Sequence, residues 1–387
     1  MRVLLATSQF APEPGGVPRL LWQFSDHRPA DIELRVLSVR QQPPAFYAAF
    51  DARAPFPIER VPPLPVGGLT SARFAARLLA AIRRWRPHLI LCGVAYPTAI
   101  IAEMATRLVS VPYVVYAHSE DITIPGQRRR RALARALWRA SAVITVSDFT
   151  RRELGRLGLD PQQVTLIPPG IELERFAQPA PLPALESRPA SWTLLTVARL
   201  VWRKGQDTVI RALPRILERV PQAHYLIVGS GPDTDGLRAL AADLGVSGHV
   251  TFAGRVSDAD LPAYYRACDA FVMPTRPSHD GSEVEGFGIV YLEAAAAGKP
   301  VIGGRAGGVA DAVLDGQTGL LVDPSSVDQV AEAVLSLALN PALARRLGEA
   351  GRERVRREFS AETFAARVSG VLERAVAPQK GSVPCHS

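Results

Sequence analysis

Short apolar segments alternate with helix-forming segments along almost the whole of this 387-residue chain. An apolar run of this length, bounded by turn residues, indicates a strand that is buried on both faces. Strands buried on both faces are typical of parallel sheets covered by helices, so the alternation restricts the chain to α/β folds. The predicted strands are 3–7, 34–39, 89–92, 113–117, 142–146 and 164–167, then 193–197, 224–228, 250–252, 270–273, 300–302 and 319–322.

The alternation is interrupted between residues 178 and 191, where Pro, Ala and Ser dominate. This stretch lacks periodicity and is typical of a linker, and the chain is too long for one ordinary core. We therefore predict two doubly wound Rossmann-like domains, over 1–184 and 185–360, that face each other across a cleft. A return of the last helical segment, 361–378, to the first domain is left open by the sequence.

Composition excludes several classes of protein. Apolar residues make up 47% and charged residues 21% of the chain, as in a globular protein. No window of 18 residues is uninterruptedly apolar, and the first residues lead into a strand without a secretory cleavage pattern. Cys92, Cys268 and Cys385 form no metal-binding spacing and fit a reducing compartment. We expect a cytoplasmic protein that holds no metal and no tightly bound cofactor.

The net charge of +8 is compatible with an anionic partner. No zinc-finger spacing and no arginine-rich arm interleaved with aromatic residues is present, so nucleic acid is not expected as a partner. Segment 70–86 carries an apolar stripe beside an arginine stripe, and 128–131 are four consecutive arginines. Together they are candidates for contact with an anionic membrane, whereas the ordinary alternative is a core face with a solvated basic face.

Segment 285–293 places two carboxylates on either side of a glycine turn. The glycines permit unusual torsions and close approach of the backbone, and a helix is predicted from about Phe287 to Gly298. The N–H groups and positive dipole end at its start suit a phosphate, with Glu285 beside them and Glu293 about two turns further on a similar side. This arrangement indicates a nucleotide-sugar site.

Basic residues and a second glycine turn follow the preceding predicted strands. Arg199 and Lys204 lie in a loop that opens a helix, where two cations can stabilise the charge on a departing nucleotide diphosphate. A solvated basic loop is the ordinary alternative. The turn at Gly229 is a weak dinucleotide signal because no third glycine follows, and Arg255 and Val256 are candidates to contact a base.

The first half contributes two further candidates at predicted strand ends. Gly15 and Gly16 follow the first strand and leave room for a ligand at the start of the next helix. His118 follows the strand 113–117 and so faces the predicted cleft, although a structural or solvated histidine explains its presence equally well.

In this order the motifs resemble glycosyltransferase family 4, the retaining nucleotide-sugar transferases of the GT-B fold. The segment 285–293 is most similar to that of bacterial α-mannosyltransferases that modify phosphatidylinositol mannosides. Pro168-Pro169-Gly170 stands where the family often has Pro-Asn-Gly. The motifs that carry the resemblance are Gly15-Gly16, His118, 167–172, Arg199, Lys204, Glu285, Glu293 and 315–321.

The resemblance implies a role for each of these side chains. Arg199 and Lys204 would bind the donor diphosphate and stabilise the leaving group. Glu285 would contact hydroxyls of the donor sugar, Glu293 the ribose, and His118 the transferred sugar. The other residues expected to contact the donor are Gly16, Gly229, Arg255, Val256, Phe287, Gly288 and Ile289.

The resemblance also implies the reaction. GDP-mannose is the favoured donor and a UDP-sugar such as UDP-glucose is the alternative; the acceptor would be lipid-linked or a glycan, at the inner face of the cell membrane. Transfer would need no metal and would proceed on the face that the diphosphate leaves. A nucleotide-sugar epimerase of the same fold stays open as another function. A phosphorylase is disfavoured, because lysine is scarce and Lys299 is the only plausible carrier of pyridoxal.

Overall fold

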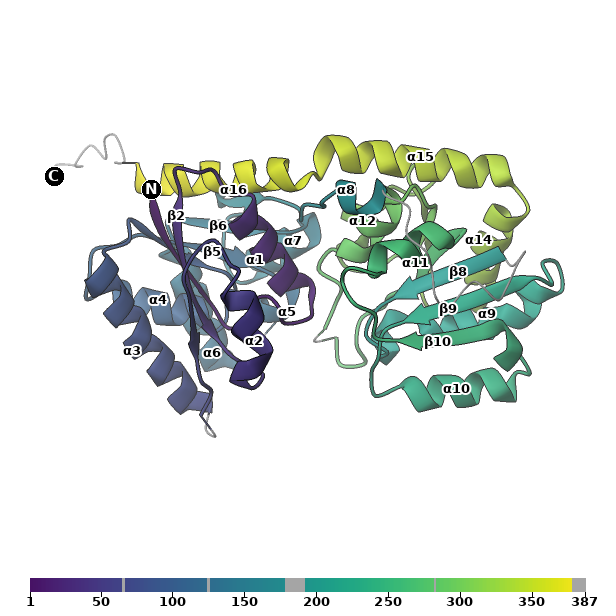
Figure 1. The fold of residues 1–387 in the computed structure, drawn as a ribbon, viewed down its shortest axis with the longest axis horizontal. Coiled ribbons are helices and arrows are strands. Elements are labelled where there is room, and N and C mark those ends of the chain that lie inside the picture. The colour runs from purple at the N-terminus through teal and green to yellow at the C-terminus, as the bar shows by residue number, and fades with distance from the viewer. Residues whose placement is uncertain (65–66, 124–125, 178–191, 282, 378–387) are drawn as a thin grey trace. The chain divides into compact units, whose positions relative to one another are not determined.

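The computed structural model describes residues 1–64, 67–123, 126–177, 192–281 and 283–377 (Figure 1). The chain forms two compact units. The first unit contains residues 1–146 and 150–167 and the chain from 362 onward, and the second contains 147–149 and 168–361. The expected linker, 178–191, and the boundary placed at residues 184 and 185 lie outside the described residues, as does Cys385.

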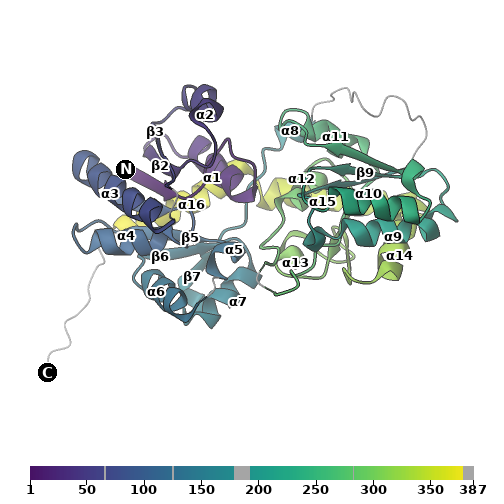
Figure 2. The same ribbon diagram turned by 90° about the horizontal axis from the view of Figure 1, so that it is seen from below.

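Each unit is built on one sheet in which every strand pair is parallel, and helices flank the strands of both units (Figure 2). Over the described residues the first sheet has the order β3-β2-β1-β4-β5-β6-β7 and the second β10-β9-β8-β11-β12-β13. The prediction of two Rossmann-like α/β folds is confirmed. The strands are β1 (Arg2–Thr7), β2 (Glu33–Val39), β3 (Ile58–Val61), β4 (Leu89–Cys92), β5 (Tyr113–Ala117), β6 (Ala142–Thr145), β7 (Val164–Leu166), β8 (Trp192–Val197), β9 (Ala223–Val228), β10 (Val250–Gly254), β11 (Ala270–Met273), β12 (Val301–Gly304) and β13 (Leu320–Val322).

The helices that matter below follow these strands in the βαβ pattern. The earlier ones are α1 (Gly16–Asp26), α2 (Pro44–Asp51), α3 (Gly67–Trp85), α4 (Thr98–Thr106), α5 (Ser119–Ile122) and α6 (Gln127–Trp138). The later ones are a short 3-10 turn (Trp202–Lys204), α9 (Gln206–Leu217), α10 (Thr234–Asp243), α11 (Leu261–Ala267), α12 (Ile289–Ala296), α14 (Val327–Ala338), α15 (Pro341–Glu358) and α16 (Ala361–Val376).

The faces of the first sheet can be told apart from strand periodicity. Val115 and Ala117 of β5 point into a core shared with α3, α4 and α6. Tyr116, between them, points to the opposite face, where its ring lies 6.4 Å from that of Phe364 on α16. The last helix of the chain therefore packs on the first unit, and the Tyr116 hydroxyl donates to the Ile167 carbonyl at 2.6 Å.

The apolar stripe predicted on segment 70–86 is part of this core. Phe74, Leu78, Ile82 and Trp85 are each at most 7% exposed, so the ordinary core-face alternative holds for this side of α3. None of the helices within the described ranges combines the length and apolar content that a membrane crossing needs.

Candidate active site

Most candidate residues of the second unit lie in the loops that follow its strands, whereas Ile289 and Glu293 lie within α12. The strand order reverses between β8 and β11, and loops that leave such a switch point diverge and form a crevice in doubly wound sheets. The loop after β8 carries Arg199 and Lys204, and the loop after β11 leads to Glu285. The topology therefore brings together Lys204 and Glu285, which are 81 residues apart in the sequence.

The loop after β8 is fixed to the end of β11 through its backbone. The carbonyl oxygen of Arg203 accepts hydrogen bonds from the Thr275 hydroxyl at 2.9 Å and from the Arg276 N–H at 2.8 Å. Gly205 follows with φ of 77°, and a Cβ at this position would collide with the Pro274 carbonyl. Only glycine tolerates both the torsion and the close approach.

Arg276 stabilises this loop through contacts with the start of α9 and with Trp202. Its side chain is 6% exposed, and one guanidinium nitrogen lies 2.7 Å from the Asp207 carboxylate while the other donates to the Thr208 hydroxyl at 2.9 Å. The guanidinium also lies 3.8 Å from the ring centroid of Trp202, which stacks on His279 at 3.6 Å. Because Arg276 joins the start of α9 to the 3-10 turn, it restrains the residues on either side of Gly205.

Five charged side chains form what we call the ionic cluster: Arg199, Arg203, Lys204, Glu283 and Glu285. The Lys204 ammonium donates to Glu285 Oε2, and Arg203 Nη1 lies 3.6 Å from the same oxygen. Arg203 Nε donates to Glu283 Oε2 at 2.9 Å, and Arg199 Nη2 is 3.9 Å from that oxygen. The sequence prediction named Arg199, Lys204 and Glu285 and missed Arg203 and Glu283.

Burial divides this cluster into an inner and an outer part. The side chains of Arg203, Lys204 and Glu285 are 6%, 12% and 14% exposed, whereas those of Arg199 and Glu283 are 63% and 50% exposed. Burial on its own raises the pKa of Glu285, but Lys204 and then Arg203 outweigh it, so the pKa lies below the ordinary value. Glu285 is therefore an ionised carboxylate at neutral pH.

The glycine turn after β12 holds the backbone of Glu285. The Gly308 N–H donates to the Glu285 carbonyl at 2.9 Å. A Cβ on Gly307 would collide with the Glu285 carbonyl, and one on Gly308 would collide with the Gly286 carbonyl. These contacts fix the segment that carries the carboxylate.

Helix α12 starts two residues later than predicted, at Ile289 and not at Phe287. The reason is Gly288, whose left-handed φ of 88° lies outside the helical region. Phe287 is buried and packs edge-on against Phe359 at 6.0 Å. Gly288 is buried and Ile289 is half-buried.

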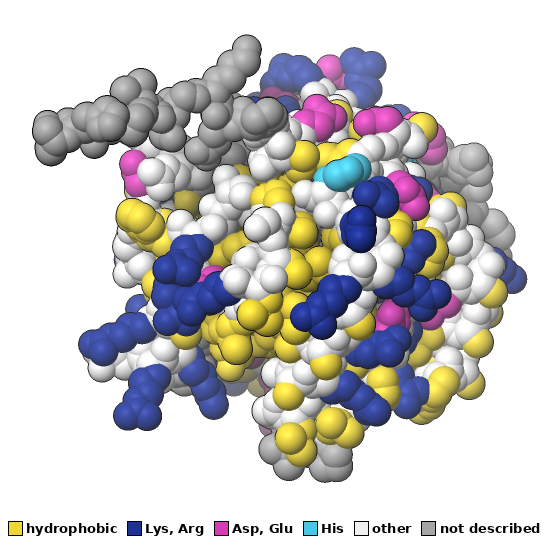
Figure 3. Space-filling view, turned by 90° about the vertical axis from the view of Figure 1, so that its left-hand side faces the viewer, with side chains coloured by type: hydrophobic (Ala, Val, Ile, Leu, Met, Phe, Trp, Pro, Cys, Tyr) yellow, Lys and Arg dark blue, Asp and Glu magenta, His cyan; other side chains and the backbone are white. Residues whose placement is uncertain are grey.

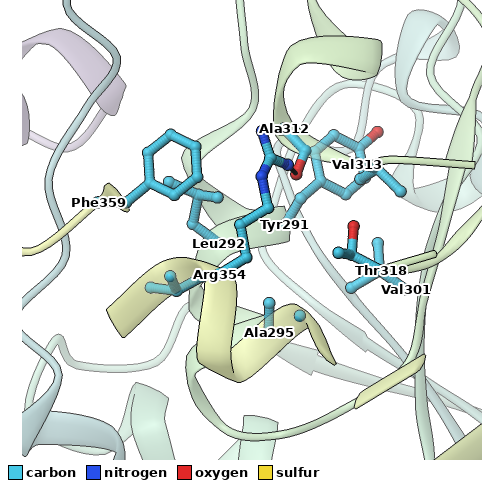
Figure 4. Close-up of a pocket in the computed structure, with 11 residues that line it drawn as sticks. Tyr291, Leu292, Ala295, Val301, Ala312, Val313, Thr318, Arg354 and Phe359 are labelled. Atoms are coloured by element: carbon cyan, nitrogen blue, oxygen red, sulfur yellow. Dashed lines mark hydrogen bonds between the residues drawn. The ribbon is translucent and has the colours of Figure 1, made fainter. Parts of the chain in front are cut away.

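Tyr291 anchors α12 to the sheet. Its buried hydroxyl donates to the Met273 carbonyl of β11 at 2.7 Å, and its ring meets Phe271 edge-on at 5.7 Å. A small cavity beside Tyr291 also touches Arg354, which extends toward the Ala312 carbonyl and donates to it at 2.9 Å (Figure 4). None of the ionic cluster lines this cavity.

Glu293 lies apart from the ionic cluster. Its side chain is buried, and Oε2 accepts a hydrogen bond from the Tyr265 hydroxyl of α11 at 2.6 Å. Tyr265 in turn packs against Phe176 and Phe271, with ring centroids 5.9 and 5.8 Å away. The two carboxylates of segment 285–293 thus have different partners: cations for Glu285 and a phenol for Glu293.

The candidates after β9 and β10 are joined to each other. The Gly229 N–H donates to the Gly254 carbonyl at 2.7 Å, just before Arg255 and Val256. Gly229 has φ of 132°, and a Cβ there would collide with the Ala198 carbonyl of the β8 loop. Arg255 is exposed and Val256 half-buried. The glycine turn therefore seats these loops against the one that carries Arg199.

The first unit places its two candidates at the carboxyl edge of its own sheet. Gly16 is exposed and begins α1, directly after Gly15 with φ of 140°. His118 is 7% exposed, stacks on Tyr116 with centroids 5.0 Å apart, and has Nε2 3.1 Å from the Gly93 carbonyl. Burial lowers the pKa of His118 to about 4, against a smaller opposite effect of that carbonyl.

The tautomer of His118 follows from these contacts. A carbonyl oxygen can only accept, so Nε2 carries the proton and Nδ1 of the neutral ring is an acceptor. The backbone N–H of His118 donates to Asp121 at 2.7 Å, and burial raises the pKa of that carboxyl to about 7 in spite of this bond and one from Ala95. The ring also accepts from the Asp121 backbone N–H in a capping box, so the neutral imidazole is held in place through both nitrogens.

Comparison with solved structures gives the class of fold. Anabaena HepE in complex with UDP superposes with a TM-score of 0.81 at 22% identity, over 96% of this chain and 100% of HepE. Sucrose-phosphate synthase from Thermosynechococcus elongatus gives 0.80 at 24% identity, over 97% and 99%. These likenesses define a two-unit glycosyltransferase fold of the GT-B type.

Sequence comparison then gives the family. One family model, described as glycosyl transferases group 1, matches residues 183–354, and another, described as glycosyltransferase family 4, matches residues 14–175. A GDP-mannose-dependent alpha-(1-6)-phosphatidylinositol monomannoside mannosyltransferase of Mycobacterium tuberculosis is 35% identical, over 96% of this chain and 98% of that protein. A GDP-mannose-dependent monoacylated alpha-(1-6)-phosphatidylinositol monomannoside mannosyltransferase of Corynebacterium glutamicum is 32% identical over the same shares. The chain belongs to glycosyltransferase family 4 and is a glycosyltransferase.

We expect Gly308→Ala to impair glycosyl transfer, because the new Cβ would push on the Gly286 carbonyl and displace Glu285. A misplacement of about 1 Å can cost on the order of 10²-fold in rate. The matched control is Gly236→Ala in α10, where a Cβ meets nothing within 4 Å. It should keep wild-type activity and gain up to about 1 kcal/mol in stability. Equal rates for the two variants in a steady-state transfer assay would contradict the prediction.

We also expect His118 to make stability depend on pH. Its folded pKa of about 4 lies below the unfolded value near 6.5, so its contribution is present above pH 6.5 and is lost as pH falls toward 4. Asp121, with a raised pKa, acts in the opposite direction, so wild type must be compared with His118→Gln. Urea unfolding at pH 7, 6 and 5 should show the two free energies converging at acid pH, and parallel curves would refute this.

Proposed function

We propose that this chain is a retaining mannosyltransferase that moves mannose from GDP-mannose to a hydroxyl of a lipid-linked acceptor, without a metal ion. The observation that carries the donor and the acceptor is the identity of 32–35% with GDP-mannose-dependent mannosyltransferases over nearly the full length of both chains. The ionic cluster supports the reaction type, because it offers cations and an ionised carboxylate at the switch point of a nucleotide-binding fold.

Arg199 and Lys204 are proposed to bind the donor diphosphate. Arg199 is 63% exposed and reachable by a ligand, whereas Lys204 is held 12% exposed by Glu285. An ammonium has three donor hydrogens, so Lys204 can keep Glu285 and still donate to a phosphate oxygen. Both cations would stabilise the negative charge that grows as the bond between the anomeric carbon and the phosphate oxygen breaks.

Glu285 is proposed to bind hydroxyls of the transferred sugar. Its carboxylate stays ionised and accepts strong hydrogen bonds from O–H donors. In the front-side mechanism the acceptor hydroxyl attacks the anomeric carbon on the face that the diphosphate leaves, and its proton passes to the departing phosphate oxygen. Configuration is retained without a covalent sugar–enzyme intermediate, so Glu285 need not act as a nucleophile.

The remaining donor contacts are proposed from the family resemblance. Glu293 would bind the ribose through its carboxylate, which also accepts from the Tyr265 hydroxyl. His118 would contact the transferred sugar, and Gly16 would lie beside the diphosphate. The amides of Phe287, Gly288 and Ile289 and the loops at Gly229, Arg255 and Val256 would complete the donor contacts.

The donor assignment can be tested by thermal unfolding with GDP, UDP, ADP and their sugar conjugates. A ligand that binds the native state raises its stability, so GDP and GDP-mannose should shift the midpoint most. GDP-mannose should also label phosphatidylinositol monomannoside in a transfer assay run in the presence of a metal chelator. A larger shift with UDP or UDP-glucose, and transfer from the latter, would replace GDP-mannose by a UDP-sugar donor, and loss of transfer with the chelator would refute metal independence.

We also propose that the first unit touches the inner, anionic face of the cell membrane, in keeping with a cytoplasmic enzyme that acts on a lipid-linked acceptor. The arginines 128–131 at the start of α6 are exposed, and so are Arg73, Arg77 and the 55% exposed Leu69 on α3. Arg77 is paired with Glu59. Seen end-on, the first unit shows basic side chains around a band of hydrophobic ones (Figure 3). Such surfaces favour anionic headgroups.

Binding to phosphatidylglycerol vesicles should therefore fall when arginines of α6 are removed. Arg128→Gln with Arg129→Gln should lower co-sedimentation about tenfold or more, since each basic residue contributes about 1 kcal/mol at an anionic surface. Arg345→Gln with Arg352→Gln, exposed on α15 of the second unit, is the control with the same change in charge. Binding that is insensitive to salt, or equal losses in both variants, would remove the proposed membrane surface.

A further inference from the structure

Arg203 is the most buried member of the ionic cluster and touches both of its carboxylates. Its side chain is 6% exposed, its Nε donates to Glu283 at 2.9 Å, and its Nη1 is 3.6 Å from Glu285 Oε2. The guanidinium fork suits two carboxylates at once, because its nitrogens are fixed in one plane. Arg203 therefore bridges two side chains that are two residues apart on the loop after β11.

The backbone of Arg203 is as constrained as its side chain. Its carbonyl accepts from both Thr275 and Arg276, so the residue cannot turn outward without breaking two buried hydrogen bonds. Arg199, four residues earlier, is ten times more exposed at 63% against 6%. A donor can meet Arg199 directly, whereas Arg203 acts only through the carboxylates that it holds.

The oxygen Glu285 Oε2 has two cationic partners, Lys204 and Arg203. With three cations and two carboxylates, the cluster carries one excess positive charge. Without Arg203 it would be neutral, and Lys204 would be the only inner cation for Glu285. Lys204 could still donate hydrogen bonds to both groups, but its single charge would then have to balance the buried carboxylate as well as the departing diphosphate, and a buried carboxylate that loses one of its cations is destabilised.

We propose that Arg203 is a positioning residue for transfer: it holds Glu285 in place as an anion, so that Lys204 can donate to the diphosphate as it leaves. Glu283, on the other side of the guanidinium, keeps Arg203 aligned and draws Arg199 toward the cluster. This inference rests on the proposed roles of Lys204 and Glu285 in donor binding. It assigns to Arg203 an effect on the rate of transfer and little effect on the affinity for the nucleotide.

The test is Arg203→Met, assayed with whichever nucleotide sugar the wild type uses and phosphatidylinositol monomannoside as acceptor. We expect kcat to fall about tenfold to a hundredfold while the KM for the donor and the Kd for its nucleoside diphosphate change less than about threefold. The groups facing Glu285 are Lys204, Arg203, Arg199 and Tyr291. Loss of one of these cations raises the pKa of the carboxyl, so the acidic limb of the kcat profile should move to higher pH.

Arg203→Lys tests whether a cation of another shape restores the function lost in Arg203→Met. An ammonium restores the charge but not the fork, so the acidic limb should return toward wild type while kcat recovers only in part. Arg211→Met, an exposed arginine on α9, is the control for loss of a cation outside the cluster and should match wild type. If Arg203→Met does not fold, Arg203→Lys and Glu283→Gln are compared, and both should lower kcat with donor KM kept.

Two results would overturn this role. One is a wild-type kcat and acidic limb in Arg203→Met; the other is a loss confined to donor KM. Failure of the proposed function looks different, because Lys204→Ala and Glu285→Gln would then leave transfer unchanged. A wild type that uses a UDP-sugar corrects the donor and leaves the test of Arg203 intact.

Discussion

Parallel pairing of every strand is the constraint on which the rest of this molecule depends. In a parallel sheet all strands end at the same edge, so side chains that follow different strands in sequence meet there in space. The strand order reverses between β8 and β11, and loops that leave such a switch point diverge and form a crevice in doubly wound sheets. The ionic cluster spans this point and joins the two loops.

The loops after β8 and β11 meet because they carry opposite charges and because glycines let their backbones approach closely. Removing Glu285 from water is unfavourable, and the adjacent Lys204 and Arg203, with a smaller contribution from Arg199, make the ionised form the stable one. Those cations reach the carboxylate because Gly205 lets the β8 loop approach Pro274, and because Gly308 lets the β12 turn approach Gly286. By allowing these close approaches of the backbone, the glycines determine where the charged side chains of the site lie.

The sequence predicts most of this fold, since period and composition report burial directly. It misses β3, Ile58–Val61, because half of that edge strand is charged and Arg60 is stabilised by Asp51, which no local pattern reveals. It misses Arg203 and Glu283 for a related reason: an Arg-Lys pair and a Glu-Val-Glu segment look like solvated loops until the sheet order places them opposite each other. Opposite charges in loops after β8 and β11 were the available signal. The helix start at Ile289 was shifted by a torsion at Gly288 that composition does not encode.

Below the ionic cluster lies a further layer that explains why the loop after β8 keeps one shape. Arg276 is buried like Arg203, yet its partners are Asp207, Thr208 and the ring of Trp202, and none of these carries a proposed role in transfer. The two buried guanidinium groups, of Arg276 and Arg203, therefore have different structural roles. Arg276 joins the start of α9 to the 3-10 turn and so restrains the loop that carries Arg203. Arg203 in turn restrains Glu283 and Glu285 through its guanidinium contacts. Rigid support of this kind favours catalysis by charge, because preorganised groups need not rearrange as the leaving group gains charge.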